Sequence, residues 1–250
     1  MPLSGGTLTA VARVGDTVRR TAGPSTAGVH DLLRHLRDRG FHLAPEPLGY
    51  DDRGREILRY IPGDTVGWQL PWPEWLRSDD LLDSVGAVTA AYHRAVSGFA
   101  PAGLPPGQIV CHHDLAPYNF VFQDGRIAGV IDWDLSGPGT ALSELAFVAW
   151  QWVPLHGPFV TSLLGWDEDT DRSGRLRRLL DAYGFEERAG FLDAVVDRIR
   201  YNRRMMLDRA AAGDAAYQAL VEQGHISGMD EALGFLDSEG PIIQAGIWDS

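Results

Sequence analysis

The chain has 250 residues, of which 44% are hydrophobic and 22% charged, with a formal net charge of −12. This composition excludes disordered, fibrous and disulfide-stapled classes. The acidic balance argues against nucleic acid as a partner and weakly favours a cationic small molecule. The only cysteine is Cys111. No secretion signal is recognised at the N-terminus, and no apolar run approaches the roughly 20 residues of a membrane span, so the expected compartment is the cytoplasm.

The first sixty residues predict a small twisted sheet with one helix. The helix is expected over 29–39, because Val29, Leu32 and Leu36 fall at helical spacing and Gly40 follows. Strands are expected around it at 11–14, 18–20, 47–50 and 56–61. Pro62-Gly63 breaks the pattern and predicts a lobe boundary.

Beyond that boundary the sequence predicts a mainly helical region that one hairpin region interrupts. Short apolar strands are expected at 109–111, 120–122 and 127–131. Amphipathic helices are expected at 81–97, 141–153, 174–183, 187–212 and 215–235. The predicted organisation is therefore α+β, with a small β-rich lobe at 1–62 and a larger, mainly helical lobe at 63–250.

Two short motifs within the hairpin region carry the chemistry. The first reads Cys111-His112-His113-Asp114-Leu115-Ala116-Pro117-Tyr118-Asn119, and the second reads Ile131-Asp132-Trp133-Asp134. An Asp and an Asn separated by four residues, followed two strands later by another Asp, are typical of a phosphoryl-transfer site. The alternative is a polar turn capped by its own side chains, which would require Asp114 and Asp132 to be coincidences together.

Cys111, His112 and His113 are three consecutive residue types that can bind zinc. Adjacent residues of an extended segment point to opposite faces, so three consecutive ligands cannot close on one ion. A partly exposed His113 lining the cleft is the preferred interpretation.

With these motifs and its order of elements, the chain resembles the aminoglycoside phosphotransferase family. The resemblance covers nearly the whole chain and is strongest at the catalytic loop. It implies a protein-kinase-like, two-lobed fold with a small β-rich N-lobe and a larger helical C-lobe. It also implies a phosphotransferase that uses ATP, or GTP in its place, to phosphorylate a hydroxyl of a small molecule such as an aminoglycoside-like antibiotic or a cationic metabolite.

The resemblance assigns roles to the motif residues. Asp114 would accept a hydrogen bond from the attacking hydroxyl, and His112 would brace the loop. Asn119 and Asp132 would hold the Mg²⁺ that bridges the nucleotide phosphates, since magnesium favours hard oxygen ligands.

The nucleotide is expected to meet the first lobe. The chain contains no lysine, so an arginine must take the place of the phosphate-binding lysine. Arg20 is the preferred anchor because it shares a strand face with Val18, whereas Arg19 lies on the other face and is the alternative; a merely solvated arginine is the third option. The remaining expected contacts are a phosphate-covering loop at Gly5 and Gly6, and adenine contacts from the backbone of Leu58, Tyr60 and Ile61.

One departure from the family concerns the helix Glu that usually pairs with the anchor. His30 stands nearest that place, and Asp31 is the alternative partner if the anchor has one. The departure supports a competing hypothesis, a nucleotide-binding pseudoenzyme of the same fold without transfer activity.

The sequence says less about the acceptor than about the nucleotide site. Only eleven residues separate Asp132 from Glu144, too few for the activation segment of a protein kinase. Glu144 is expected to cap its helix or tie down the catalytic loop. Acidic acceptor contacts could come from Asp193, Asp197 and Asp208, although a solvated helix face is favoured. Antibiotic resistance is implied only by analogy, and oligomeric state is not predicted.

Overall fold

The computed structural model describes residues 11–67 and 69–248. The chain forms two compact units, and neither is continuous in sequence. One contains the residues up to Gln69 together with Val88–Glu144, and the other contains Leu70–Ala87 and the residues from Leu145 onward. The lobe boundary at residue 62 is a different division, and it stays a prediction.

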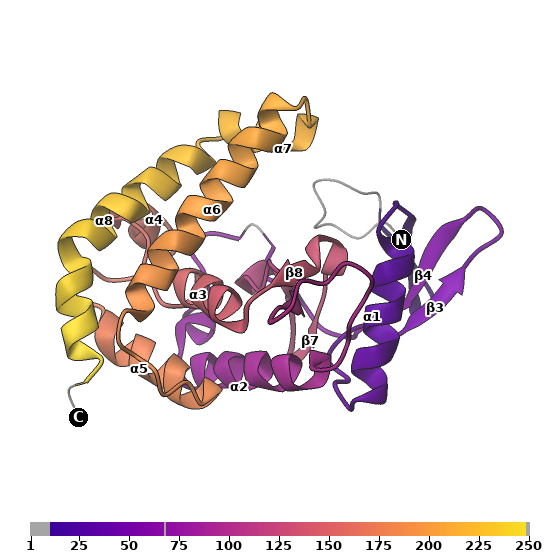
Figure 1. The fold of residues 1–250 in the computed structure, drawn as a ribbon, viewed down its shortest axis with the longest axis horizontal. Coiled ribbons are helices and arrows are strands. Elements are labelled where there is room, and N and C mark those ends of the chain that lie inside the picture. The colour runs from indigo at the N-terminus through magenta and orange to yellow at the C-terminus, as the bar shows by residue number, and fades with distance from the viewer. Residues whose placement is uncertain (1–10, 68, 249–250) are drawn as a thin grey trace. The chain divides into compact units, whose positions relative to one another are not determined.

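The first unit contains a four-stranded antiparallel sheet in the order β1-β2-β4-β3. Its strands are β1 (Ala12–Val14), β2 (Thr17–Thr21), β3 (Pro47–Tyr50) and β4 (Arg55–Arg59). Helix α1 (Thr26–Asp38) lies beside β3 and β4 (Figure 1). Its apolar positions Leu32, Leu33 and Leu36 are all buried, as their helical spacing predicts.

Two antiparallel strand pairs of the same unit frame the motif residues. Strands β6 (Phe120–Gln123) and β7 (Arg126–Val130) form a hairpin, and β5 (Ile109–Cys111) pairs with β8 (Gly137–Gly139). Short 3₁₀ turns, η2 (Pro117–Asn119) and η3 (Trp133–Leu135), follow the catalytic loop and β7. The residues between Asp132 and Glu144 are thus used by η3 and β8, which leaves no room for a peptide platform.

Gly63 joins the segment after β4 to this hairpin. Its φ of +138° is a conformation that side chains rarely adopt, and an added Cβ would overlap the backbone oxygen of Phe122. Next to it, Asp64 and Phe122 exchange two backbone hydrogen bonds of 2.8 Å. The Pro62-Gly63 break therefore ends the sheet and fastens the chain to β6.

Helices dominate the rest of the chain. They are η1 (Glu74–Arg77), α2 (Asp79–Val96), α3 (Ala141–Trp152), α4 (Pro158–Leu163), α5 (Arg172–Tyr183), α6 (Phe191–Ala211), α7 (Ala215–Glu222) and α8 (His225–Gly246). In the second unit α6 and α8 run side by side (Figure 1). Leu176, Leu179, Val195 and Ile199 are fully buried there, so α5 and α6 each pack an apolar face into the core of this unit.

Most expected elements agree with the structure to within a few residues, but the sequence analysis did not predict β8, α4 or the short 3₁₀ turns, and one predicted helix is wrong. The single helix predicted over 215–235 is two helices, because Gly224 adopts a left-handed conformation with φ +88° and separates α7 from α8. Among the described helices, none combines enough length with enough apolar character to cross a membrane.

Candidate active site

The catalytic loop begins at His112, which is completely buried after β5. Its Nδ1 accepts a hydrogen bond from the backbone N–H of Asp114 at 3.2 Å, so Nε2 carries the proton and donates to the carbonyl of Ile131 at 3.0 Å. Burial lowers the pKa of His112 to about 4, which keeps the ring neutral. His112 thereby connects the catalytic loop to the end of β7, which is the bracing role predicted for it.

Asp114 has hydrogen-bond donors at both carboxylate oxygens. The hydroxyl of Tyr118 donates to Oδ1 at 2.9 Å, and the amide of Asn119 donates to Oδ2 at 2.8 Å. The same amide also donates to the Asp114 carbonyl at 2.9 Å. Burial, followed by the charge of Asp114, raises the pKa of Tyr118 well above its usual value, so Tyr118 remains a donor. Asp114 is therefore a fixed, oriented carboxylate.

Asp132 lies next to Asn119 in the fold, because the N–H of Ile131 donates to the Asn119 carbonyl at 2.9 Å. Its φ of +64° turns the chain sharply, and the next side chain, Trp133, is buried against Phe41, Tyr92 and His112. The two flanking carboxylates of the Asp-Trp-Asp segment consequently remain exposed.

The donor set at this point fits a magnesium ion. The Asn119 amide nitrogen is directed at Asp114, which leaves the amide oxygen for another partner, and Asp132 offers a carboxylate whose side chain is 55% exposed. Partial desolvation by the surrounding groups, followed by the charge of Asp134, raises the pKa of Asp132. A nearby cation would relieve that repulsion, and oxygen donors are the ligands that Mg²⁺ prefers.

Glu144 ties down the catalytic loop from the first turn of α3. It is fully buried, accepts a 2.6 Å hydrogen bond from the N–H of His113, and contacts Nε2 of His93 at 2.9 Å. Burial raises its pKa, but the His93 hydrogen bond and the neighbouring histidines outweigh burial and the net pKa is lowered. His113 itself has φ +69°, a conformation that favours glycine. Its predicted partial exposure is observed.

Arg20, the predicted phosphate anchor, stands in the same unit with three acidic neighbours. Its NH1 and NH2 donate to both oxygens of Asp134 at 2.9 and 2.6 Å, its NH1 lies 3.7 Å from Asp132, and its Nε lies 2.5 Å from Glu56. Burial lowers the pKa of Arg20, but the charges of Asp134, Glu56 and Asp132 outweigh burial and raise it. Arg20 is thus charged, oriented and adjacent to the candidate metal ligands.

The partner of Arg20 was not found from the sequence. Asp31 is exposed and pairs with Arg34 instead, so the structure does not bear out Asp31 as the partner of the anchor. His30 contacts Glu56, not Arg20. Arg19, the alternative anchor, is paired with Asp51. The solvated-arginine option for Arg20 is wrong, because its side chain is only 12% exposed.

The structure supports some of the other predicted nucleotide contacts and argues against one of them. Val18 pairs with Leu58 in register, so these apolar side chains share one sheet face with Arg20 and Glu56. The N–H of Tyr60 already donates to the Asp16 carbonyl at 2.9 Å, which removes it as an adenine donor in this conformation. Ile61 packs its side chain near Gly129. Gly5 and Gly6 lie outside the described residues.

Two further sequence interpretations concern a zinc site at residues 111–113 and acidic acceptor contacts on α6. The side chains of Cys111, His112 and His113 reach three different carbonyls, those of Thr140, Ile131 and Pro138, and no metal-binding group of His, Cys, Asp and Glu occurs among the described residues. Asp193, Asp197 and Asp208 are exposed on α6, as expected of a solvated face.

The functional residues that sequence reasoning missed are Glu56 and Tyr118. Tyr118 lies inside the catalytic motif, and its spacing of four from Asp114 was available as a signal. Glu56 is the one acidic residue of β4, which reads Arg-Glu-Ile-Leu-Arg. Its position opposite Arg20, however, depends on strand register.

Comparisons with known proteins show the family of the chain. The profile of the phosphotransferase enzyme family matches residues 96–179, which include the catalytic loop and Asp132. A trifolitoxin immunity protein from Rhizobium leguminosarum bv. trifolii is 35% identical over 210 residues, covering 78% of this chain and 78% of that protein. The chain belongs to the phosphotransferase enzyme family.

Solved structures show the fold of this phosphotransferase family member. A choline/ethanolamine kinase family protein from Mesorhizobium loti is 19% identical with a TM-score of 0.60, covering 99% of this chain and 91% of that one. An amicoumacin kinase, solved with AMP-PNP, Ca²⁺ and Ami, is 13% identical with a TM-score of 0.63, covering 89% and 87%. The predicted kinase-like α+β fold is therefore confirmed.

Proposed function

We propose that this protein transfers the γ-phosphoryl group of ATP to a hydroxyl of an antibiotic or a related small molecule. The observation that carries the proposal is the Asp114 carboxylate, held by Tyr118 and Asn119 in the catalytic motif. Family membership supports the reaction class. Because the co-substrate is a nucleoside triphosphate, the proposed compartment is the cytoplasm.

Asp114 positions the attacking group in this proposal. Its carboxylate accepts a hydrogen bond from the substrate hydroxyl and takes the proton as the new P–O bond forms, while the bond between the γ-phosphorus and the β–γ bridging oxygen breaks and ADP leaves. Tyr118 and Asn119 fix the direction of the carboxylate, so little reorganisation is needed during transfer. His112, neutral and buried, keeps the loop that carries Asp114 attached to β7.

The proposed ligands of Mg²⁺ are the amide oxygen of Asn119 and the carboxylate of Asp132. When bound there, the ion would supply positive charge that offsets the charge of the nucleotide phosphates. The hydrogen bond between Ile131 and Asn119 keeps these two donors adjacent.

Arg20 is the proposed phosphate anchor. A guanidinium that grips a carboxylate through two parallel hydrogen bonds has the geometry needed to grip two phosphate oxygens. A bound phosphate would compete with Asp134 for these two donors of Arg20.

The acceptor class is proposed from two observations. The relative that is 35% identical is named a trifolitoxin immunity protein, which favours a toxic compound over a housekeeping metabolite. The formal net charge of −12 favours a cationic compound. Aminoglycosides, amicoumacin, trifolitoxin and choline are therefore the first compounds to test.

The test is a mass-spectrometric panel of these acceptors with ATP or GTP and Mg²⁺, run in parallel with Asp114→Ala. The expected result is a mass gain of one phosphoryl group with wild-type protein and none with the variant. Nucleotide binding without transfer to any acceptor would favour the pseudoenzyme hypothesis. Absence of magnesium-nucleotide binding would overturn the proposed function.

A further inference from the structure

The cationic group of the proposed phosphate site has an unusual partner. No lysine exists in the chain, and the residue of α1 nearest the expected helix carboxylate is His30. A carboxylate is nevertheless present, and it comes from the sheet itself. Glu56 on β4 is the cross-strand neighbour of Arg20 on β2, so both side chains leave the same sheet face.

Different partners contact the two edges of the Arg20 guanidinium. Nε is 2.5 Å from Oε1 of Glu56, while NH1 and NH2 form the edge that donates to Asp134. This close ion pair holds the Nε edge of the guanidinium against Glu56, and the other edge keeps two parallel donors for an anion.

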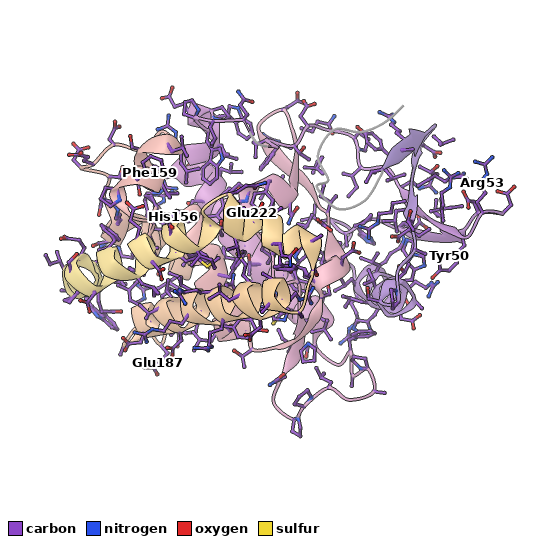
Figure 2. All side chains as sticks on the ribbon, turned by 90° about the horizontal axis from the view of Figure 1, so that it is seen from above. Tyr50, Arg53, His156, Phe159, Glu187 and Glu222 are labelled. Atoms are coloured by element: carbon purple, nitrogen blue, oxygen red, sulfur yellow. The ribbon has the colours of Figure 1, made fainter. Side chains whose placement is uncertain are left out.

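The second oxygen of Glu56 is also engaged. Nε2 of His30 lies 3.1 Å from Oε2, and the His30 ring stacks on Tyr50 with centroids 5.1 Å apart. Glu56 and His30 are each only 1% exposed. Tyr50 projects from the β3–β4 hairpin, near the Arg53 turn (Figure 2). A buried carboxylate is retained at such a place only when its oxygens are paired, so α1 contributes to the anchor through His30.

We propose that Glu56 is the positioning residue that aims Arg20 at the nucleotide phosphates, with His30 supporting Glu56 from α1. This sheet-borne carboxylate takes over the task for which the sequence offers no helix Glu. The inference rests on the proposed function, because it presumes that Arg20 meets nucleotide phosphates.

The first test measures steady-state kinetics for Glu56→Gln, which keeps the shape and removes the charge. The expected result is an increase of about 10- to 100-fold in the KM for ATP, because a neutral amide no longer holds the guanidinium by charge, with a smaller change in kcat. The matched control is Asp31→Asn, an exposed carboxylate of α1 that should leave the KM for ATP unchanged.

The second test is a double-mutant cycle, which separates positioning from folding. In the Arg20→Met background the carboxylate has no guanidinium to aim, so adding Glu56→Gln should change nucleotide affinity by less than about twofold. Affinity is measured by calorimetry with ADP, with and without Mg²⁺, and folding by thermal melting. His30→Gln, which keeps a donor for Glu56, should restore most of the affinity lost in His30→Ala.

The outcomes distinguish this inference from the proposed function. If wild-type protein binds no nucleotide, the proposed function fails. If wild-type protein binds and transfers, but Glu56→Gln leaves the KM for ATP unchanged, the inference alone fails. Equal losses from Glu56→Gln in the presence and absence of Arg20 would also overturn it, because Glu56 would then act on the fold and not through Arg20.

Discussion

At the residue scale, Asp114 and Asp132 have different surroundings, so replacing each with alanine should affect kcat and nucleotide affinity differently. Asp114→Ala should lower kcat by about 10²- to 10⁴-fold, the usual contribution of a positioned base, and leave nucleotide affinity intact. Asp132→Ala should also weaken nucleotide binding in the presence of Mg²⁺, because it removes a proposed metal ligand. Initial rates and calorimetry check both variants. A fully active Asp114→Ala protein would contradict the mechanism.

A second prediction concerns His156, just before α4 (Figure 2). Burial lowers its pKa from the ordinary 6.5 to about 4. Between these values the unfolded chain binds a proton that the folded chain does not, so stability present above pH 6.5 is lost as the pH falls to 4. One such group contributes a slope of about 1.4 kcal/mol per pH unit.

His156→Phe keeps a ring next to Trp150 and removes this proton uptake. Urea unfolding at several pH values between 4 and 6.5 should show a shallower loss of unfolding free energy than in wild-type protein. Part of the slope should remain, because His112 has the same shift in the same direction. If the unfolding free energy of the two proteins falls with pH at the same slope, His156 is not the source of the pH dependence.

Individual residues also mark the limit of prediction from sequence. Asp114, Asn119 and Asp132 could be identified because their spacing along the chain is short and local. Glu56 could not be assigned, because its meaning depends on a register between strands separated by the whole of α1. Of the two roles expected of Glu144, tying down the catalytic loop is observed, as the hydrogen bond that it accepts from the N–H of His113.

At the element scale, the join between Gly63 and the β6–β7 hairpin is the most sensitive to substitution. Gly63→Ala adds a Cβ against the Phe122 backbone, which cannot move aside, and should lower the unfolding free energy by about 2–4 kcal/mol. Gly54→Ala is the matched control, because Gly54 also has positive φ but open space around it; about 1 kcal/mol is expected there. Chemical denaturation measures both, and equal losses would contradict the steric argument.

Elements with strong local signals were predictable. The β6–β7 hairpin is bounded by turn residues, and α1 has a clear apolar face. The division between α7 and α8 was missed because apolar residues continue through it at helical spacing. Only the left-handed conformation of Gly224 separates the two helices, and a single glycine inside an apolar pattern is a weak signal.

At the scale of the whole molecule, ligand binding should be visible in thermal stability. ATP with Mg²⁺ at about 100 times its Kd should stabilise the protein by about 2.7 kcal/mol, which is about 5–10 °C in Tm for a chain of this size. Differential scanning calorimetry with wild-type protein and Asp132→Ala checks this. An equal shift in both proteins would show that Asp132 does not hold the metal.

Cys111 has one further practical consequence. It is the only cysteine of the chain, it is completely buried at the end of β5, and it immediately precedes the catalytic loop. A thiol in that position reacts with an alkylating reagent only when the surrounding strands open. The rate of alkylation in native buffer therefore reports how often the catalytic loop opens. Slower alkylation after addition of nucleotide would measure, without an engineered probe, how much the ligand reduces this opening.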